Sequence, residues 1–281
     1  MTGSLVALAL ILVPAAVPQT AADLEREKPA IVQTALDYAE GYYGGEPARM
    51  ARAVSTSLSK RGLMVRPGVP PFLVQMNADT LIDAANGAKV APADRHIATE
   101  VLDVQQDIAS ARVFTAQFND YLQLVRRNGA WQIVNVLWHA PPAAGQKTDG
   151  AADAVERAVR AYVAALYTSD ARALLAVVHP QANLRTFAPP PQGRPRIIRE
   201  QNPETLAAAL AGGMVKMPGK ADDAQVVVQG IDADIATAKL TIGQTTTYLH
   251  LAMTDGKWRV VNALGYPPAP PATKPAAPLA I

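Results

Sequence analysis

Hydrophobic and polar positions alternate along two long stretches of the chain, and the same order of elements precedes each stretch. From residue 96, and again from residue 225, the hydrophobic period is two, which is typical of half-buried β-strands. Before each stretch, apolar residues recur at helical spacing, which predicts two to three helices. Strands are predicted at about 96–105, 108–118, 120–127 and 130–138, and again at about 225–232, 234–243, 246–254 and 257–264.

The two stretches are copies of one unit. Trp131 and Trp258 are 127 residues apart, and each follows a tight turn, Asn128-Gly129 in the first copy and Asp255-Gly256 in the second. Such turns join two antiparallel strands into a hairpin. The repeat therefore predicts an α+β protein with two tandem cone-shaped domains, each with two to three helices packed on a curved antiparallel sheet.

Segments rich in proline, glycine or alanine separate the predicted parts of the chain. The segment at the C-terminal end has too few large apolar residues to offset the entropy of ordering and is predicted to be disordered. The predicted parts are a signal peptide (1–22), a first domain (23–139), a linker (140–153), a second domain (154–266) and a Pro/Ala-rich tail (267–281).

The N-terminal segment contains an apolar run from Leu5 to Val13, followed by Pro14 and Pro18. The run is short for a membrane span, which needs about 20 residues. It favours a secretory signal cleaved near Ala21 or Ala22, and hence a periplasmic or secreted protein that contacts no membrane after signal removal. No lysine or arginine precedes the run, so either the N-terminal amine supplies the positive charge or the start site lies upstream. An uncleaved membrane anchor is the alternative to a signal peptide.

Charge and composition exclude several classes of function. The net charge of +2 is too small to indicate a nucleic-acid partner or an acidic membrane surface. The chain has no cysteine, which excludes disulfides, thiolate metal sites and cysteine nucleophiles. Its four histidines are scattered without metal-ligand spacing, and no Gly-rich phosphate loop follows a strand. We therefore expect neither a metal nor a cofactor.

Local signals give a few boundaries. Asn77 and Asn202 are predicted to cap helices, each three residues before a threonine. Pro29 suits the first turn of a helix, where its missing N–H costs nothing. Residues Pro67 to Pro71 are predicted to form a rigid loop.

The order of helices and strands, with a Gly-x-Trp strand at the end, resembles the nuclear-transport-factor-2-like (NTF2-like) fold, which ketosteroid isomerases share. The first copy, roughly residues 30–138, resembles more closely the bacterial family described as "putative lumazine-binding". The second copy keeps the strands but lacks the Lys-Arg-Gly element. The resemblance implies a small-molecule pocket, although most members have no assigned activity. It is carried by Tyr38-Ala39-Glu40-Gly41-Tyr42-Tyr43, Arg49-Met50, Lys60-Arg61-Gly62, Asp103-Val104, Asp107-Ile108-Ala109-Ser110-Ala111-Arg112-Val113, Asp120-Tyr121-Leu122 and the strand Trp131 to Trp138.

Several side chains are candidates for lining a pocket inside the cones. By strict alternation Asn135 shares one strand face with apolar residues, and Asn262 repeats this in the second copy. Such an amide either faces a ligand or bonds to backbone or a tyrosine. Arg61 either orients an anionic group, pairs with Glu40, or is solvated. The predicted pocket candidates are Tyr38, Tyr42, Arg61, Asn135, Trp138 and Asn262.

Catalysis requires an acid–base group that points into a cone. Asp120 precedes Tyr121 at a hairpin turn and is expected to be solvated. His96 is expected at a solvated loop end, and no histidine is paired with an aspartate at a spacing typical of a dyad. We therefore predict no catalytic residue. The other acid–base candidates are Asp103, His179 and His250.

Three functions remain open. The sequence favours an exported, non-enzymatic protein that binds a small apolar or aromatic ligand, or a partner, mainly through the first copy. The second is a cofactor-independent isomerase or dehydratase of the ketosteroid-isomerase kind, which requires a carboxylate or histidine inside a cone. The third is a structural or adaptor protein. In each case the sheet faces can pair, within the chain or as a homodimer.

Overall fold

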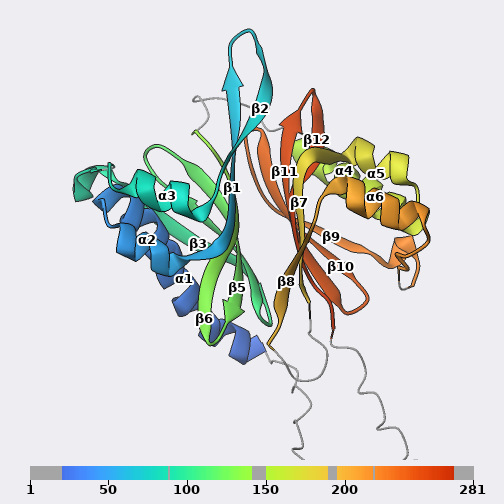
Figure 1. Ribbon diagram of the computed structural model, residues 1–281, viewed down its shortest axis with the longest axis horizontal. Helices are drawn as coiled ribbons and strands as arrows, with labels where there is room; N and C mark the ends of the chain where they lie inside the picture. Colours follow the sequence, from blue (N-terminus) through green and yellow to red (C-terminus); the bar gives the residue numbers. More distant parts are fainter. Residues whose placement is uncertain (1–20, 88, 141–149, 189–194, 218, 269–281) are drawn as a thin grey trace, which may run out of the picture.

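The computed structural model describes residues 21–87, 89–140, 150–188, 195–217 and 219–268. The described chain forms two six-stranded sheets, with the helices of each half on the outer side of its own sheet and the two sheets face to face in the middle (Figure 1). The expected α+β architecture of two tandem domains is confirmed.

The first half contains three α-helices and six strands within its described residues, and its strand order is β2-β1-β6-β5-β4-β3. Strand β1 runs parallel to β6, and the other neighbours are antiparallel. The elements are α1 (Ala21–Gly44), α2 (Pro47–Ala53), β1 (Val54–Arg66), β2 (Val69–Met76), α3 (Ala78–Ala85), β3 (Ala98–Gln105), β4 (Ile108–Phe114), β5 (Asn119–Arg127) and β6 (Ala130–His139).

The second half repeats this plan, with strand order β8-β7-β12-β11-β10-β9 and β7 parallel to β12. A short 3₁₀ turn precedes β3 in the first half and β9 in the second. The elements are α4 (Ala151–Tyr167), α5 (Ala171–Val177), β7 (Val178–Ala188), β8 (Ile197–Gln201), α6 (Pro203–Ala211), β9 (Gln225–Asp232), β10 (Ile235–Ile242), β11 (Thr245–Thr254) and β12 (Lys257–Tyr266).

The eight strands predicted from the period of two are all present, within a few residues of their expected ends. Strands β1, β2, β7 and β8 were not predicted. The expected rigid loop at residues 67–71 is wrong, because Pro70 and Pro71 lie in β2. β2 is an edge strand, where a missing N–H can face solvent without breaking a ladder hydrogen bond.

Two boundaries also differ from expectation. Pro29 lies inside α1, which begins at Ala21, so it does not mark the first turn. Helix α4 begins at Ala151, inside the segment predicted as linker. The rest of that linker, at 141–149, and most of the predicted signal peptide and tail, at 1–20 and 269–281, lie outside the described residues.

The helix caps and hairpin turns are built as their residues predict. The Asn77 side chain accepts a hydrogen bond from the Thr80 N–H at 2.9 Å, which satisfies a free donor of the first turn of α3. Asn202 does the same for Thr205 at 2.7 Å in α6. The turns Asn128-Gly129 and Asp255-Gly256 have positive φ angles throughout, as tight hairpins require, and occupy matching positions in the two sheets.

Each half has its own apolar core between its helices and the helix-facing side of its sheet. Helices α1 and α2 cross closely at Gly41, where a Cβ atom would lie 2.8 Å from the backbone nitrogen of Met50. Large buried members of the first core are Ile31, Met50, Leu81, Leu122 and Trp131, and those of the second are Val159, Tyr162, Leu174, Leu249 and Trp258.

The sheets contact each other through two further apolar clusters that are copies of one another. In one, Ile108, Val125 and Val134 of the first half meet Phe187, Tyr248 and Leu264 of the second. In the other, Ile235, Ala252 and Val261 of the second half meet Leu63, Tyr121 and Leu137 of the first. Equivalent residues exchange roles, so the two halves form an isologous pair within one chain.

A buried polar layer accompanies these clusters. The Arg61 guanidinium donates to Asn262 Oδ1 at 2.8 Å and to the carbonyl of Gln181 at 2.7 Å. The equivalent Arg185 donates to Asn135 Oδ1 at 3.0 Å and to a carbonyl of the first half. Both arginines are about as buried as the apolar core, at 4% and 5% exposed. Each half therefore supplies an arginine whose partners lie largely in the other half.

Candidate functional site

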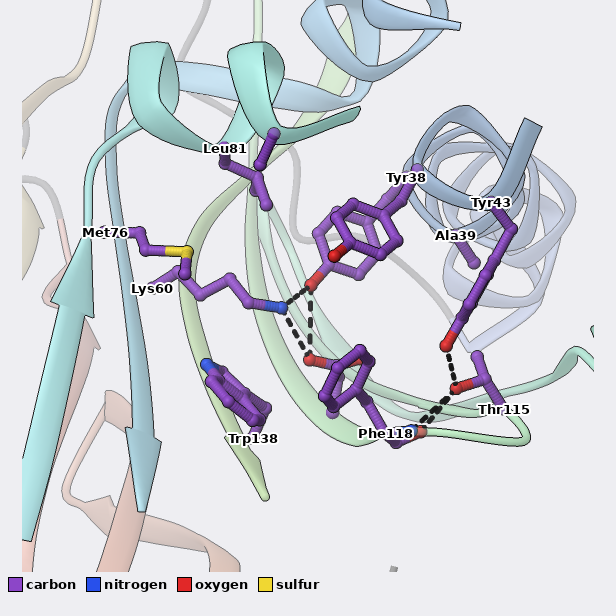
Figure 2. Close-up of a pocket in the computed structure, with 12 residues that line it drawn as sticks. Tyr38, Ala39, Tyr43, Lys60, Met76, Leu81, Thr115, Phe118 and Trp138 are labelled. Carbon is purple, nitrogen blue, oxygen red and sulfur yellow. Dashed lines mark hydrogen bonds and ion pairs between the residues drawn. The ribbon is translucent and has the colours of Figure 1, made fainter. Parts of the chain in front are cut away.

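The first half contains a pocket of about 80 Å³ between its helices and the helix-facing side of its sheet. Most of its wall is apolar or aromatic, with a charged pair at one side (Figure 2). The lining residues are Tyr38, Ala39, Tyr42, Tyr43, Lys60, Met76, Leu81, Ala84, Thr115, Phe118, Asp120 and Trp138.

The elements bring these side chains together from distant parts of the sequence. Tyr38 and Tyr42 are one helical turn apart on α1 and share its inner face. Lys60 is on β1, which pairs in parallel with β6, and Asp120 on β5 lies directly opposite Trp138 on β6. The parallel β1–β6 pair thus places a lysine and a carboxylate on the same side of the sheet, under the helix that carries the tyrosines.

A three-residue polar centre lies at one side of the pocket. The Lys60 ammonium donates to Asp120 Oδ1 at 3.0 Å and to the Tyr38 hydroxyl, and that hydroxyl donates to Asp120 Oδ1 at 3.2 Å. Figure 2 shows these bonds as a closed triangle. All three side chains are buried, with exposed fractions of 3% to 7%. Burial, reinforced by the charge of Asp120, raises the pKa of Tyr38 well above its usual value, so its phenol is neutral and can donate.

Aromatic rings form the wall beside this centre. Phe118 meets the ring of Trp138 edge to face at 5.0 Å between centroids, and meets Tyr42 at 6.4 Å. The Lys60 ammonium also lies 5.4 Å from the Trp138 ring. Such rings offer a flat apolar surface and attract the positive edge of a bound group.

Two details of the backbone hold the wall in place. Trp138 lies against Gly62, where a Cβ atom would come 2.2 Å from its ring, so only glycine leaves room for it. Phe118 lies in the β4–β5 turn, whose end is fixed by Thr115: its hydroxyl donates to the Phe118 carbonyl at 2.8 Å and accepts from the Phe118 N–H at 2.9 Å. Tyr43 of α1 contacts the same Thr115 hydroxyl at 2.7 Å.

The equivalent positions of the second half carry none of this polar centre except the tyrosine. Leu184 stands in place of Lys60, Thr247 in place of Asp120, and Gly265 in place of Trp138. Tyr162, the equivalent of Tyr38, is a core residue whose pKa burial raises to about 12. The charged centre therefore belongs to one half of a duplicated fold.

The structure brings together three of the six predicted pocket residues, Tyr38, Tyr42 and Trp138. It places Arg61, Asn135 and Asn262 elsewhere, buried between the two sheets, and none of them lines this pocket. Arg61 is neither solvated nor paired with Glu40, which binds Arg49 instead.

Two residues of the centre were missed from the sequence. The expectation that Asp120 is solvated is wrong: it is 5% exposed and accepts from Lys60 and Tyr38. Lys60 was noted only as part of a motif. The signal that could have found both is their residue type, because a lysine and an aspartate in the first copy are replaced by Leu184 and Thr247 in an otherwise matching second copy.

The remaining acid–base candidates lie away from the pocket. Asp103 accepts from the Tyr248 hydroxyl at 2.6 Å and from Lys239 at 2.7 Å across the two halves, and His250 lies in the polar layer between the sheets. His96 is exposed, and His179 lies in β7 of the second half. Among the residues that the structure describes, no three histidine, aspartate or glutamate side chains are grouped as metal ligands would be. Within the same residues, no helix combines the length and apolar character needed to cross a membrane.

Comparison with known proteins gives the family. The profile of the family described as "Putative lumazine-binding" matches residues 26–139 and again 151–264. The chain belongs to this family, twice over. The resemblance of the first copy to this family is confirmed. The second half also matches the family profile although it lacks the charged centre. Family membership alone therefore does not imply that centre.

Three solved structures similar to this member of the family each align with less than half of it. An NTF2-like protein of unknown function from Silicibacter pomeroyi is 23% identical, with a TM-score of 0.36, over 41% of this chain and 97% of its own. One from Shewanella baltica is 24% identical, with a TM-score of 0.36, over 42% and 97%. A ketosteroid isomerase-like protein from Erwinia carotovora is 16% identical, with a TM-score of 0.30, over 42% and 97%. A search of curated proteins found no similar sequence.

Proposed function

We propose that this is an exported, non-enzymatic protein whose first half binds a small molecule in the pocket beside Tyr38, Lys60 and Asp120. The observation that carries the proposal is the buried charged centre in an aromatic pocket, present in one copy and absent from the other. Buried charges are costly, and replacing such a pair with apolar residues is often neutral or stabilising. The second half made that replacement at the lysine position and keeps the same fold, which supports a role in binding for the pair in the first half.

Size and surroundings limit the ligand. A pocket of about 80 Å³ accommodates a small group or a single ring, below the 300–1,000 Å³ typical of drug-sized ligands. Its apolar walls favour a small apolar or aromatic molecule with one polar edge directed at the centre. Lumazine, which the family description mentions, is a bicyclic heterocycle and would fit only if a wall residue such as Phe118 moved.

Native mass spectrometry of the full-length protein purified from its source tests the proposal. We expect a co-purified small molecule, or a bound probe such as lumazine, at the first half. Tyr38→Phe should weaken binding about tenfold, because it removes a hydrogen bond to a charged group. The matched variant Tyr162→Phe in the second half should leave binding unchanged. Binding that neither variant alters, or no binding by any probe, would overturn the proposal.

Export is a separate part of the proposal and rests on the apolar run from Leu5 to Val13. The N-terminal sequence of the secreted or periplasmic protein should begin near residue 22 or 23. An intact N-terminus on protein found in the membrane fraction would favour the anchor instead.

One observation favours a second function, that of a cofactor-independent isomerase or dehydratase. Asp120 provides the carboxylate inside the cone that such chemistry requires. Both donors, however, bind the same oxygen, Oδ1, and hold the carboxylate in an ion pair. Deuterium uptake from D₂O into a bound carbonyl compound, abolished in Asp120→Asn, would establish this function; retained binding without uptake would exclude it.

A further inference from the structure

The polar centre has unused hydrogen-bonding capacity on both of its charged members. An ammonium has three N–H donors, and Lys60 uses two, for Asp120 and Tyr38. The Asp120 carboxylate accepts both of its bonds at Oδ1, and among the described residues no donor reaches its Oδ2. The centre therefore offers a ligand one free donor beside one free acceptor.

The net charge of the centre is zero, and this limits what it can bind. A carboxylate ligand that reached the Lys60 ammonium would also face the Asp120 carboxylate, and an ammonium ligand would face Lys60, because the two groups are only 3.0 Å apart. Both kinds of ion would also lose their hydration in a largely apolar pocket, with no surplus opposite charge to offset the loss. An uncharged group that carries an acceptor next to a donor satisfies both members at once.

The walls add a preference for a flat ligand. Tyr42, Phe118 and Trp138 present ring faces and edges beside the centre, and the pocket volume suits one six-membered ring. Tyr38 acts as a positioning residue: its hydroxyl contacts both Lys60 and Asp120 and so fixes the spacing of the free donor and acceptor.

We propose that the first half selects an uncharged cyclic amide, with the Lys60 ammonium donating to the ring carbonyl and the Asp120 carboxylate accepting from the adjacent ring N–H. This inference rests on the proposed binding function and states its ligand class. Amides are usually bound by Asn, Gln or backbone groups. Here a charged pair takes their place, so each hydrogen bond to the ligand is charge-assisted.

Three probes of similar size test the ligand class by isothermal titration calorimetry on the full chain at pH 7. They are 2-pyridone, which is an uncharged cyclic amide, benzoate and benzylamine. We expect 2-pyridone to bind at least tenfold more tightly than either ion, because a site built for a donor–acceptor pair rejects a ligand that leaves one member unpaired.

Variants of the pair should change the preference in a defined direction. Asp120→Asn gives the centre a positive charge and should move the preference from 2-pyridone toward benzoate by about tenfold. The double variant Lys60→Met with Asp120→Asn removes both charges, is expected to fold, and should lose tenfold or more for 2-pyridone without gaining affinity for either ion. Thr247→Val, at the position equivalent to Asp120 in the second half, is the matched control and should change nothing.

The outcomes separate this inference from the binding function itself. If benzoate or benzylamine binds as tightly as 2-pyridone, and the double variant abolishes that binding, the pocket binds ligands but the class is wrong. If no probe binds and no small molecule co-purifies, the binding function also fails. If 2-pyridone binds equally well to the wild type and the double variant, the charged pair does not bind the amide group and the inference is overturned.

Discussion

Trp138 rests on the backbone of Gly62, and this contact shapes one wall of the pocket. An alanine at this position would place its Cβ atom 2.2 Å from the indole, which cannot be accommodated without moving the ring. The position equivalent to Trp138 in the second half is Gly265, where a Cβ atom would lie 3.4 Å from Thr247 Oγ1, an ordinary contact. Gly265→Ala, at a position that pairs with Thr186 as Trp138 pairs with Gly62, therefore serves as a control substitution without the clash.

We predict that Gly62→Ala lowers the free energy of unfolding by about 1–3 kcal/mol, because overpacking forces Trp138 out of its position. Ligand binding should weaken at the same time, since Trp138 lines the pocket. Urea denaturation followed by tryptophan fluorescence measures the first effect. Gly265→Ala should stay within about 0.5 kcal/mol of the wild type. Equal losses in the two variants would contradict this account of the wall.

His250 and its equivalent, Gln123, form different hydrogen bonds in the polar layer between the sheets. The Gln123 amide donates to the Tyr248 carbonyl at 3.0 Å and accepts from Asn135, whereas His250 contacts Asn262 through Nδ1 and its Nε2 has no hydrogen-bond partner among the described residues. Burial, together with the charge of Arg61, lowers the pKa of His250 to about 3. The folded protein therefore holds this histidine neutral.

We predict that His250 makes the protein lose stability in mild acid. Its pKa is lower in the folded state than the usual 6.5 of an unfolded chain, so the unfolded state binds more protons below that pH. The stabilisation is complete above about pH 6.5 and is lost as the pH falls toward 3, at up to about 1.4 kcal/mol per unit. Urea denaturation between pH 4 and 7 measures the slope. His250→Gln, which installs the residue of the first half, should flatten it; an unchanged slope would assign the effect to other groups.

At the scale of elements, the edge strands β2 and β8 differ in the hydrogen bonds that they form with the buried arginines. Glu200 on β8 lies opposite Arg185 and accepts from its guanidinium at 2.8 and 3.0 Å. Gln75 on β2 lies opposite Arg61 in the same way but reaches it only at 3.5 Å and without charge. Burial and the neighbouring Arg185 lower the pKa of Arg61 to about 10.

We predict that Gln75→Glu raises the free energy of unfolding by about 0.5–1 kcal/mol, since it supplies Arg61 with the partner that Arg185 already has. Glu200→Gln should lower it by a similar or larger amount. Urea denaturation at low and high salt tests both, and the gain from Gln75→Glu should shrink as salt screens the partly exposed pair. A destabilised Gln75→Glu variant would mean that Arg61 has no room for a second charge-assisted bond.

A β-bulge explains which site residues the sequence could place. Strict alternation puts Asn135 on the same face as Trp131 and Ile133, pointing toward the helices. In β6 the register shifts between Ile133 and Asn135, so Val134 and Asn135 both face the second half and Val136 returns to the inner core. The same shift occurs in β12 before Asn262. Because a bulge has no clear signature in one sequence, the faces of these two amides could not be predicted.

The strands and the tyrosines were predictable for the opposite reason. The period of two is long and regular in β4, β5, β10 and β11, and Tyr38 and Tyr42 lie on an inner helix face that depends only on helical spacing. Lys60 was not placed because β1 was not predicted as a strand, whereas Asp120, at the start of a predicted strand, was assigned to a solvated hairpin turn. Strand β1 pairs in parallel with β6, which lies about 75 residues further along the chain. No local sequence pattern therefore indicates this pairing.

At the scale of the molecule, the two apolar clusters and the polar layer tie the halves into one unit. Leu264 packs against Ile108, Val125 and Val134 of the first half, and its equivalent Leu137 packs against Ile235, Ala252 and Val261 of the second. Separating the halves would expose both clusters and deprive two buried arginines of the partners that the other half supplies. We therefore expect the halves to unfold together rather than in sequence.

We predict a single transition in differential scanning calorimetry, with equal calorimetric and van't Hoff enthalpies. Leu264→Ala should lower the Tm of that transition by roughly 5–15 °C, the result of a cavity that costs about 2–5 kcal/mol. Leu137→Ala should give nearly the same shift, because the two leucines occupy equivalent sites. Two resolved transitions, with only one of them moved by either variant, would contradict the cooperative unit.

Joining the two halves in one polypeptide has a further consequence. A homodimer built from one gene product must carry the same residue at both equivalent positions, whereas a tandem chain can hold Lys60 and Asp120 on one side and Leu184 and Thr247 on the other. We expect such a molecule to bind one ligand per polypeptide at saturation, with a hyperbolic binding isotherm and no cooperativity between equivalent sites.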